Sequence, residues 1–124
     1  DSVINTTKRK MEAGANFFLT QPVFSKEEAK RLRKIKEETG ACIFAGIMPL
    51  ISRRNALFMK NEIAGINVTD EIVERYPENG SKEEGEKVAV ELAKEIISYI
   101  DDFADGYYFS FPFNRVYLLN RILG

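Results

Sequence analysis

The chain has 124 residues, of which 44% are hydrophobic and 30% charged, and its formal net charge is -1. This composition is typical of a soluble globular domain and excludes a fibrous or disordered chain. The 18 basic residues are dispersed among 19 acidic ones, which argues against a nucleic-acid partner. With one cysteine and no histidine, the chain can form no internal disulfide and lacks the usual ligands of a zinc site, so we expect no metal.

No segment of the sequence has the character of a membrane anchor. The apolar runs are far shorter than the roughly 18 residues that a membrane span requires. The N-terminus also lacks the apolar stretch of a signal peptide. We therefore expect a cytoplasmic protein with no membrane partner.

The first half of the chain predicts two helices that alternate with two strands. A helix over about 2–12, closed by Gly14 as a left-handed cap, leads to a strand over about 17–20. A helix over 25–39, opened by the Ser-x-x-Glu spacing of a capping box, leads to a strand over about 41–47. This second strand is apolar on both faces, which is typical of a parallel sheet covered on both sides.

The second half continues the alternation. Ser52 can cap one short helix and Thr69 another, and three- and four-residue apolar steps predict a long amphipathic helix over 81–100. A strand over 107–111 follows, and Asn114 can cap a terminal helix. Alternating strands and helices predict β/α units joined by right-handed crossovers, with ligands bound at the carboxyl ends of the strands. Three strands are few for a closed domain, so the chain reads as part of a larger barrel.

Three motifs in order resemble a known family. They are AGANFFLTQPVF (13–24), FAGIMPLISRRNALFMKNEIAGI (44–66) and GYYFSFPFNR (106–115), with SKEEGEKVAVELAKEII (81–97) between the last two. Together they resemble the C-terminal part of methylenetetrahydrofolate reductase. The NE-x-x-GI spacing and the PFNR ending are closest to the reductase module of bifunctional homocysteine S-methyltransferase/5,10-methylenetetrahydrofolate reductase.

The resemblance implies a fold and an activity. Family members are (β/α)8 TIM barrels that bind FAD and pass a hydride from NAD(P)H through the flavin to 5,10-methylenetetrahydrofolate, as part of one-carbon and methionine metabolism. Residues 1–124 would then be the last three β/α units of an α/β barrel, present as a partial barrel, with the rest of the parent reductase barrel as their partner. The family's acidic catalytic residue lies on N-terminal strands that match no part of this chain. The resemblance therefore implies no catalytic residue here and an isolated chain that is inactive.

Three residues correspond to folate contacts of the family. Gln21 matches the amide that contacts the pterin and then the nicotinamide, and an amide offers both a donor and an acceptor. Asn55 stands where several members have a glutamine that contacts the folate, although its side chain is shorter. Arg115 matches an arginine placed for the glutamate tail, where a guanidinium can grip a carboxylate through two bonds. The plainer interpretations are a turn amide for Gln21 and a surface arginine of the last helix for Arg115.

Thr6, Arg9 and Lys10 correspond to flavin contacts of the family. The basic pair matches residues on the phosphate side of the flavin, but cations are favoured in the last turn of any helix by its dipole. Solvated helix charges are therefore the alternative for Arg9 and Lys10.

Two other interpretations of the whole chain stay open. An unrelated β/α-barrel enzyme could share the pattern, because fold does not determine chemistry. A stand-alone α/β binding or interaction module is also consistent with it. Because parallel strands with open faces invite association, we expect the purified chain to form a homo-oligomer.

Overall fold

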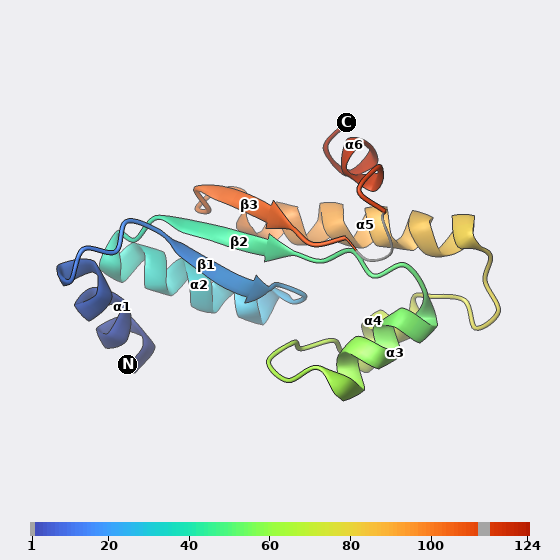
Figure 1. Ribbon diagram of the computed structural model, residues 1–124, viewed down its shortest axis with the longest axis horizontal. Helices are drawn as coiled ribbons and strands as arrows, with labels where there is room; N and C mark the ends of the chain where they lie inside the picture. Colours follow the sequence, from blue (N-terminus) through green and yellow to red (C-terminus); the bar gives the residue numbers. More distant parts are fainter. Residues whose placement is uncertain (1, 112–114) are drawn as a thin grey trace.

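The computed structural model describes residues 2–111 and 115–124, and its three strands form one parallel sheet. The strands are β1 (Phe18–Pro22), β2 (Ile43–Ile47) and β3 (Gly106–Phe109), in the order β1-β2-β3. The helices are α1 (Ser2–Glu12), α2 (Lys26–Thr39), α3 (Arg53–Glu62), α4 (Asp70–Glu74), α5 (Lys82–Ile100) and α6 (Leu118–Leu123). The predicted α/β class and parallel sheet are confirmed, and the carboxyl ends of all three strands lie at one edge (Figure 1).

Hydroxyl side chains begin four of the helices. Each accepts the backbone N–H of the residue three positions on, and these caps are Ser25, Ser52, Thr69 and Ser81. The predicted capping box is complete at α5, where the Glu84 carboxylate accepts the Ser81 N–H at 3.0 Å. At α2 the box is different, because the Glu28 carboxylate accepts the N–H of Phe24 rather than that of Ser25. Glu28 thereby ties the chain leaving β1 to the start of α2.

The apolar core lies on one face of the sheet. Ala45 and Ile47 of β2 are buried there with Ala29 of α2 and with Ile96 and Ile100 of α5. α2 and α5 run along this face (Figure 1). Burial of such side chains stabilises the fold, because fully burying a Leu- or Ile-sized side chain is worth roughly 1.5–3 kcal/mol.

The other face of the sheet is open among the described residues. Phe17 is 54% exposed and Leu19 is 60% exposed, while Phe44 and Tyr108 are half-buried. The sequence of β2 predicted cover on both faces, and the structure shows cover on one. The difference arises because every helix that packs on β2 in the described part of the chain lies on the core side.

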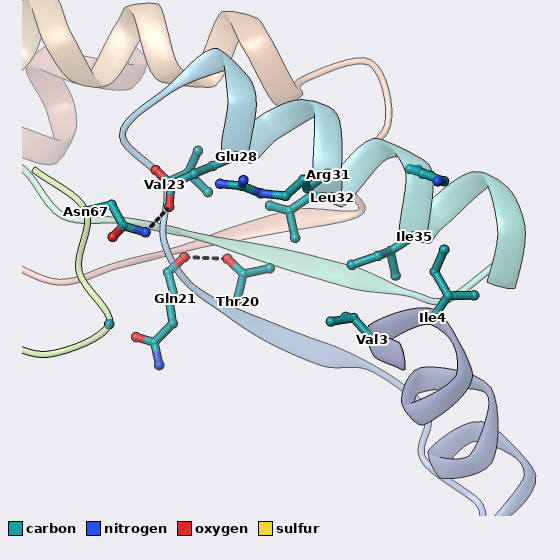
Figure 2. Close-up of a pocket in the computed structure, with 12 residues that line it drawn as sticks. Val3, Ile4, Thr20, Gln21, Val23, Glu28, Arg31, Leu32, Ile35 and Asn67 are labelled. Carbon is teal, nitrogen blue, oxygen red and sulfur yellow. Dashed lines mark hydrogen bonds between the residues drawn. The ribbon is translucent and has the colours of Figure 1, made fainter. Parts of the chain in front are cut away.

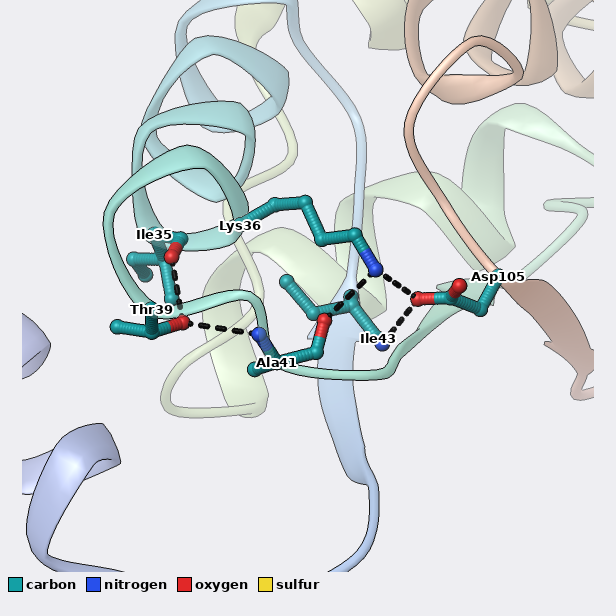
Figure 3. A network of polar contacts seen from close by, with 6 residues as sticks. All are labelled: Ile35, Lys36, Thr39, Ala41, Ile43 and Asp105. Carbon is teal, nitrogen blue, oxygen red and sulfur yellow. Dashed lines mark hydrogen bonds and ion pairs between the residues drawn. The ribbon is translucent and has the colours of Figure 1, made fainter. Parts of the chain in front are cut away.

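Two ion pairs clasp α2 to the turn before β3 at the opposite, amino-terminal edge of the sheet. The Arg33 guanidinium donates two bonds, of 2.6 and 2.7 Å, to the Asp102 carboxylate. Lys36 donates to the Asp105 carboxylate at 2.6 Å and to the Ala41 carbonyl at 2.9 Å. Asp105 also accepts the N–H of Ile43 at 2.8 Å and so joins β2 to β3 (Figure 3).

The C-terminal helix begins later than predicted. Asn114, the predicted cap, lies outside the described residues, and α6 begins at Leu118 after a turn in which the Arg115 carbonyl accepts the Leu118 N–H at 2.9 Å. Arg115 therefore precedes the helix rather than lying in its first turn. In residues 2–111 and 115–124, no helix has both the length and the hydropathy needed to cross a bilayer.

Asp105 should make stability depend on pH. Its hydrogen bonds from Lys36, and then from Ile43, lower the pKa of its carboxyl. Its stabilising contribution is therefore present above the unfolded-state pKa of about 3.9 and is lost as the pH falls through the lower pKa of the folded state. We expect Asp105→Asn to lower the free energy of unfolding at pH 7 by about 1 kcal/mol, a charge-assisted bond discounted for solvent exposure. Urea denaturation at pH 7 and pH 3 checks this; an equal loss at both pH values would contradict it.

Candidate functional site

A bulge in β1 shapes the carboxyl-terminal edge of the sheet. Leu19 pairs with Phe44 and Pro22 with Gly46, so that Thr20 and Gln21 together face the single residue Ala45. Such bulges bend a strand and redirect its side chains, and they are common beside active sites. β1 ends at Pro22, two residues beyond the predicted end, because pairing with β2 resumes after the bulge.

The Thr20 side chain accepts a backbone hydrogen bond of β2 at the point where the bulge interrupts the regular pairing. Its hydroxyl accepts the Gly46 N–H at 2.9 Å and donates to the Gln21 carbonyl at 2.7 Å. The Thr20 carbonyl in turn accepts a hydrogen bond from the Tyr108 hydroxyl. One residue of β1 is thus bonded to both β2 and β3.

Tyr108 reaches Thr20 by crossing the open face of β2 at a glycine. A Cβ atom at Gly46 would lie 2.8 Å from the Tyr108 hydroxyl oxygen and 2.9 Å from its Cζ, closer than real contacts allow. The absence of a side chain at Gly46 therefore lets the ring lie across the strand. This packing fixes the position of the bulge that carries Gln21.

Gln21 presents its amide on the open side of the bulge. Its side chain is exposed and points away from α2 (Figure 2). A cavity of about 330 Å³ lies beside the bulge on the α2 side, lined by Thr20 and Gln21, by apolar and charged residues of α1 and α2, and by Gly65 and Asn67 of the loop after α3. Because the amide points away from α2, it can meet a ligand on the open side of the sheet rather than inside this cavity.

Asn55 lines a second, smaller cavity at the ends of β2 and β3. This cavity of about 180 Å³ is bounded by Met48, Asn55, Met59, Ser110 and Phe111. The Asn55 side-chain oxygen accepts the Ile51 N–H at 3.0 Å, and so part of its hydrogen-bonding capacity shapes the loop before α3. Met59 and Phe111 give the cavity apolar walls that suit an aromatic ring.

Two close contacts hold the loop before α3, the helix that carries Asn55. The Tyr76 hydroxyl donates to the Leu50 carbonyl at 2.6 Å, and burial of this side chain raises the pKa of Tyr76 above its usual value. Gly85 of α5 packs so tightly against the Ile51 carbonyl that a Cβ atom there would overlap it. Asn55 consequently sits on a rigid support.

Arg115 is engaged by a carboxylate of α5. Its guanidinium donates to Glu86 at 2.6 Å, and its side chain is 18% exposed. Tyr117 also donates its hydroxyl to Glu86, and Arg121 lies 3.7 Å from the second carboxylate oxygen. The interpretation of Arg115 as a plain surface arginine does not fit this burial.

Thr6, Arg9 and Lys10 lie away from these residues. All three are exposed on α1, and the two cations occupy its last turn. Because α1 leads directly into the start of β1, this turn is near the amino ends of the strands, whereas Gln21 is at the carboxyl end (Figure 1).

The structure thus places Gln21 near the end of β1, Asn55 on α3 after β2, and Arg115 after β3, without gathering them around one cavity in the described part of the chain. Sequence reasoning missed Glu86, although a signal was present. Glu86 precedes Ala89 by three residues and Ala93 by seven, which puts it on the buried stripe of α5.

Parallel β/α units with polar side chains at their carboxyl edge define the class of ligand-binding β/α domains. A sequence model of the family described as methylenetetrahydrofolate reductase matches residues 1–108. The chain therefore belongs to the methylenetetrahydrofolate reductase family, a family of folate-related oxidoreductases. No curated protein matches the chain significantly.

The contact between Gly46 and Tyr108 can be tested by a double-mutant cycle. We expect Gly46→Ala to lower the free energy of unfolding by about 1–3 kcal/mol, because the new methyl group displaces the Tyr108 ring. The same substitution in a Tyr108→Ala background should cost much less, since the ring is gone. Urea denaturation of the four proteins measures the coupling, and equal costs of Gly46→Ala in both backgrounds would contradict the packing described.

Proposed function

We propose that this chain supplies one side of the folate-binding edge of a flavin-dependent reductase that converts 5,10-methylenetetrahydrofolate to 5-methyltetrahydrofolate. The observation that carries the proposal is the exposed Gln21 amide, held on a bulge at the carboxyl edge of a chain that belongs to this family. An amide there can donate to and accept from a pterin ring, which presents both kinds of group. Gln21 binds and orients the pterin in this proposal.

The other two polar residues serve the rest of the same substrate. The cavity beside Asn55 has sulfur and aromatic walls and is suited to the ring system of the folate. Arg115 lies after the third strand, where its guanidinium can meet the carboxylates of the glutamate tail. The order of the three residues along the sheet edge would then follow the substrate from pterin to tail.

FAD and NAD(P)H enter the proposal through family membership. When bound, FAD carries the hydride between the nicotinamide and the folate. The exposed cations Arg9 and Lys10, with Thr6, are a donor set that fits the phosphate side of such a group. We propose this residue set as the chain's share of flavin binding.

The open face of the sheet supports a barrel of which this chain is a part. Leu19 and Phe17 expose apolar surface that a further layer of β/α units would cover. We therefore propose that residues 1–124 are the last three units of a (β/α)8 barrel and are inactive alone. The motif NE-x-x-GI favours the bifunctional form fused to homocysteine S-methyltransferase, working in the cytoplasm.

The isolated chain gives the first test. Titration with FAD, followed by flavin fluorescence, should show no tight binding, and light scattering on a sizing column should show a dimer or larger species. Both results follow from a sheet whose second face lacks cover. Tight FAD binding by a monomer would show that the chain is a domain in its own right and would refute the partial barrel.

Gln21 gives the second test, in the reductase that contains this chain. We expect Gln21→Ala to reduce kcat/KM for the folate about tenfold or more, as the loss of one or two hydrogen bonds predicts, while FAD content is unchanged. Asn16→Ala is the matched control, because Asn16 is an exposed amide residue ahead of β1. Equal folate kinetics in both variants would exclude the assignment of Gln21.

A further inference from the structure

Glu86 is an unusual residue in this fold because it is a buried carboxylate. Its side chain is 7% exposed, and apart from Thr7 it is the only buried polar or charged residue in the described part of the chain. Ionised carboxylates are rarely buried without close partners, since losing their hydration costs several kcal/mol. The partners of Glu86 should therefore explain its position.

Those partners come from the segment that follows β3. Arg115 donates to one carboxylate oxygen at 2.6 Å, Tyr117 donates its hydroxyl to the same oxygen, and Arg121 of α6 lies 3.7 Å from the other oxygen. α5 and the C-terminal segment are thus joined through a single carboxylate. Two guanidinium groups around one carboxylate leave the cluster with one unit of positive charge.

The two arginines differ in how firmly they are held. The Arg115 side chain is 18% exposed and is bonded through one terminal nitrogen, whereas the Arg121 side chain is 49% exposed and forms the longer contact. A guanidinium carries five N–H groups in a rigid plane, so Arg115 can keep its bond to Glu86 and still donate to a second carboxylate. Arg121 can meanwhile keep the charge of Glu86 balanced.

We propose that Glu86 is a positioning residue that fixes the Arg115 guanidinium for a ligand carboxylate, with Arg121 as the second counter-ion of Glu86. The inference rests on the proposed function, in which this ligand carboxylate belongs to the glutamate tail of the folate. Glu86 itself does not touch the ligand. It holds the long arginine side chain in place before the ligand arrives, and this lowers the conformational entropy that the side chain loses on binding.

The negative charge of Glu86 and its role as an anchor for Arg115 should have opposite effects on the binding of an anion. Removing a negative charge beside Arg115 should strengthen the binding of an anion through Coulomb attraction. Removing the anchor should weaken binding, because a freed guanidinium turns towards solvent and must be ordered again. The Arg115 side chain is only 18% exposed where it contacts Glu86, and so we expect the loss of the anchor to dominate. Loss of the carboxylate should therefore weaken the binding of an anion.

The experiment uses the 124-residue chain and two probes. N-(4-aminobenzoyl)-L-glutamate carries the ring and both tail carboxylates, and 4-aminobenzamide carries the ring alone. NMR titration of the wild-type chain should show tighter binding of the glutamate probe. We expect Glu86→Ala to weaken that binding about three- to tenfold, the cost of ordering one long side chain, with no effect on the ring probe. Glu86→Gln retains an acceptor for Arg115 and should stay within about twofold of wild type.

Glu91→Gln is the matched control, because Glu91 is exposed on the same helix and the substitution removes the same charge. It should leave both affinities unchanged. Unchanged or tighter binding of the glutamate probe by Glu86→Ala would overturn the proposal, as would equally weak binding by Glu86→Gln and Glu86→Ala.

A measurement on the wild-type chain covers the case in which Glu86→Ala does not fold. The Nε–Hε resonance of Arg115 should shift on addition of the glutamate probe and saturate with the same Kd as the backbone signals. An unmoved resonance would overturn the positioning role. Equal affinity of the wild-type chain for both probes would also overturn it, while the reductase function would still be decided by the Gln21→Ala kinetics.

Discussion

The carboxyl-terminal edge of this sheet depends on one hydroxyl group, that of Thr20. A parallel ladder cannot tolerate an extra residue unless something replaces the hydrogen bond that is lost, because an unpaired buried N–H is costly. The Thr20 hydroxyl accepts the Gly46 N–H at 2.9 Å, and the Thr20 carbonyl is bonded by Tyr108. The bulge is therefore stable, and the Gln21 amide is exposed on the open side. Without this repair, β1 would continue in regular register and carry Gln21 elsewhere.

The two edges of the sheet divide stability and binding between them. At the amino edge, two residues of α2 form ion pairs with the turn before β3. Arg33 pairs with Asp102, and Lys36 pairs with Asp105. At the carboxyl edge lie an exposed amide, a cavity and a guanidinium that is bonded through one nitrogen, which are the groups of the proposed binding site. In β/α proteins, loops at the carboxyl ends of strands change with function while the opposite ends maintain the fold. This chain follows that division with ion pairs in place of a larger core.

Local signals in the sequence predicted most of the fold. Hydroxyl caps, Gly14 with its positive φ of 106° after α1, and the apolar steps of α5 each act within a few residues, and the helices they predict are observed. The bulge was not predictable, because it depends on which residue of β2 faces Thr20. The environment of Arg115 was also hidden, since Glu86 lies 29 positions away and meets it only after α5 and the C-terminal segment pack together. Local sequence signals thus predict helices and strands, whereas the contacts of their polar side chains depend on residues far away in the sequence.

The open face of the sheet carries both exposed apolar side chains and the Gln21 amide, so covering it would affect stability and ligand binding together. Leu19 and Phe44 pair in register, and the Tyr108 ring crosses Gly46 on the same side, so one layer placed over this face would contact all of them. Gln21 also lies on that side (Figure 2). Burying the exposed apolar surface would contribute roughly 25 cal/mol per Å² and would exclude water from the amide at the same time. A layer that completes the core would thereby also complete the wall of the site, and ligand affinity and fold stability would rise together.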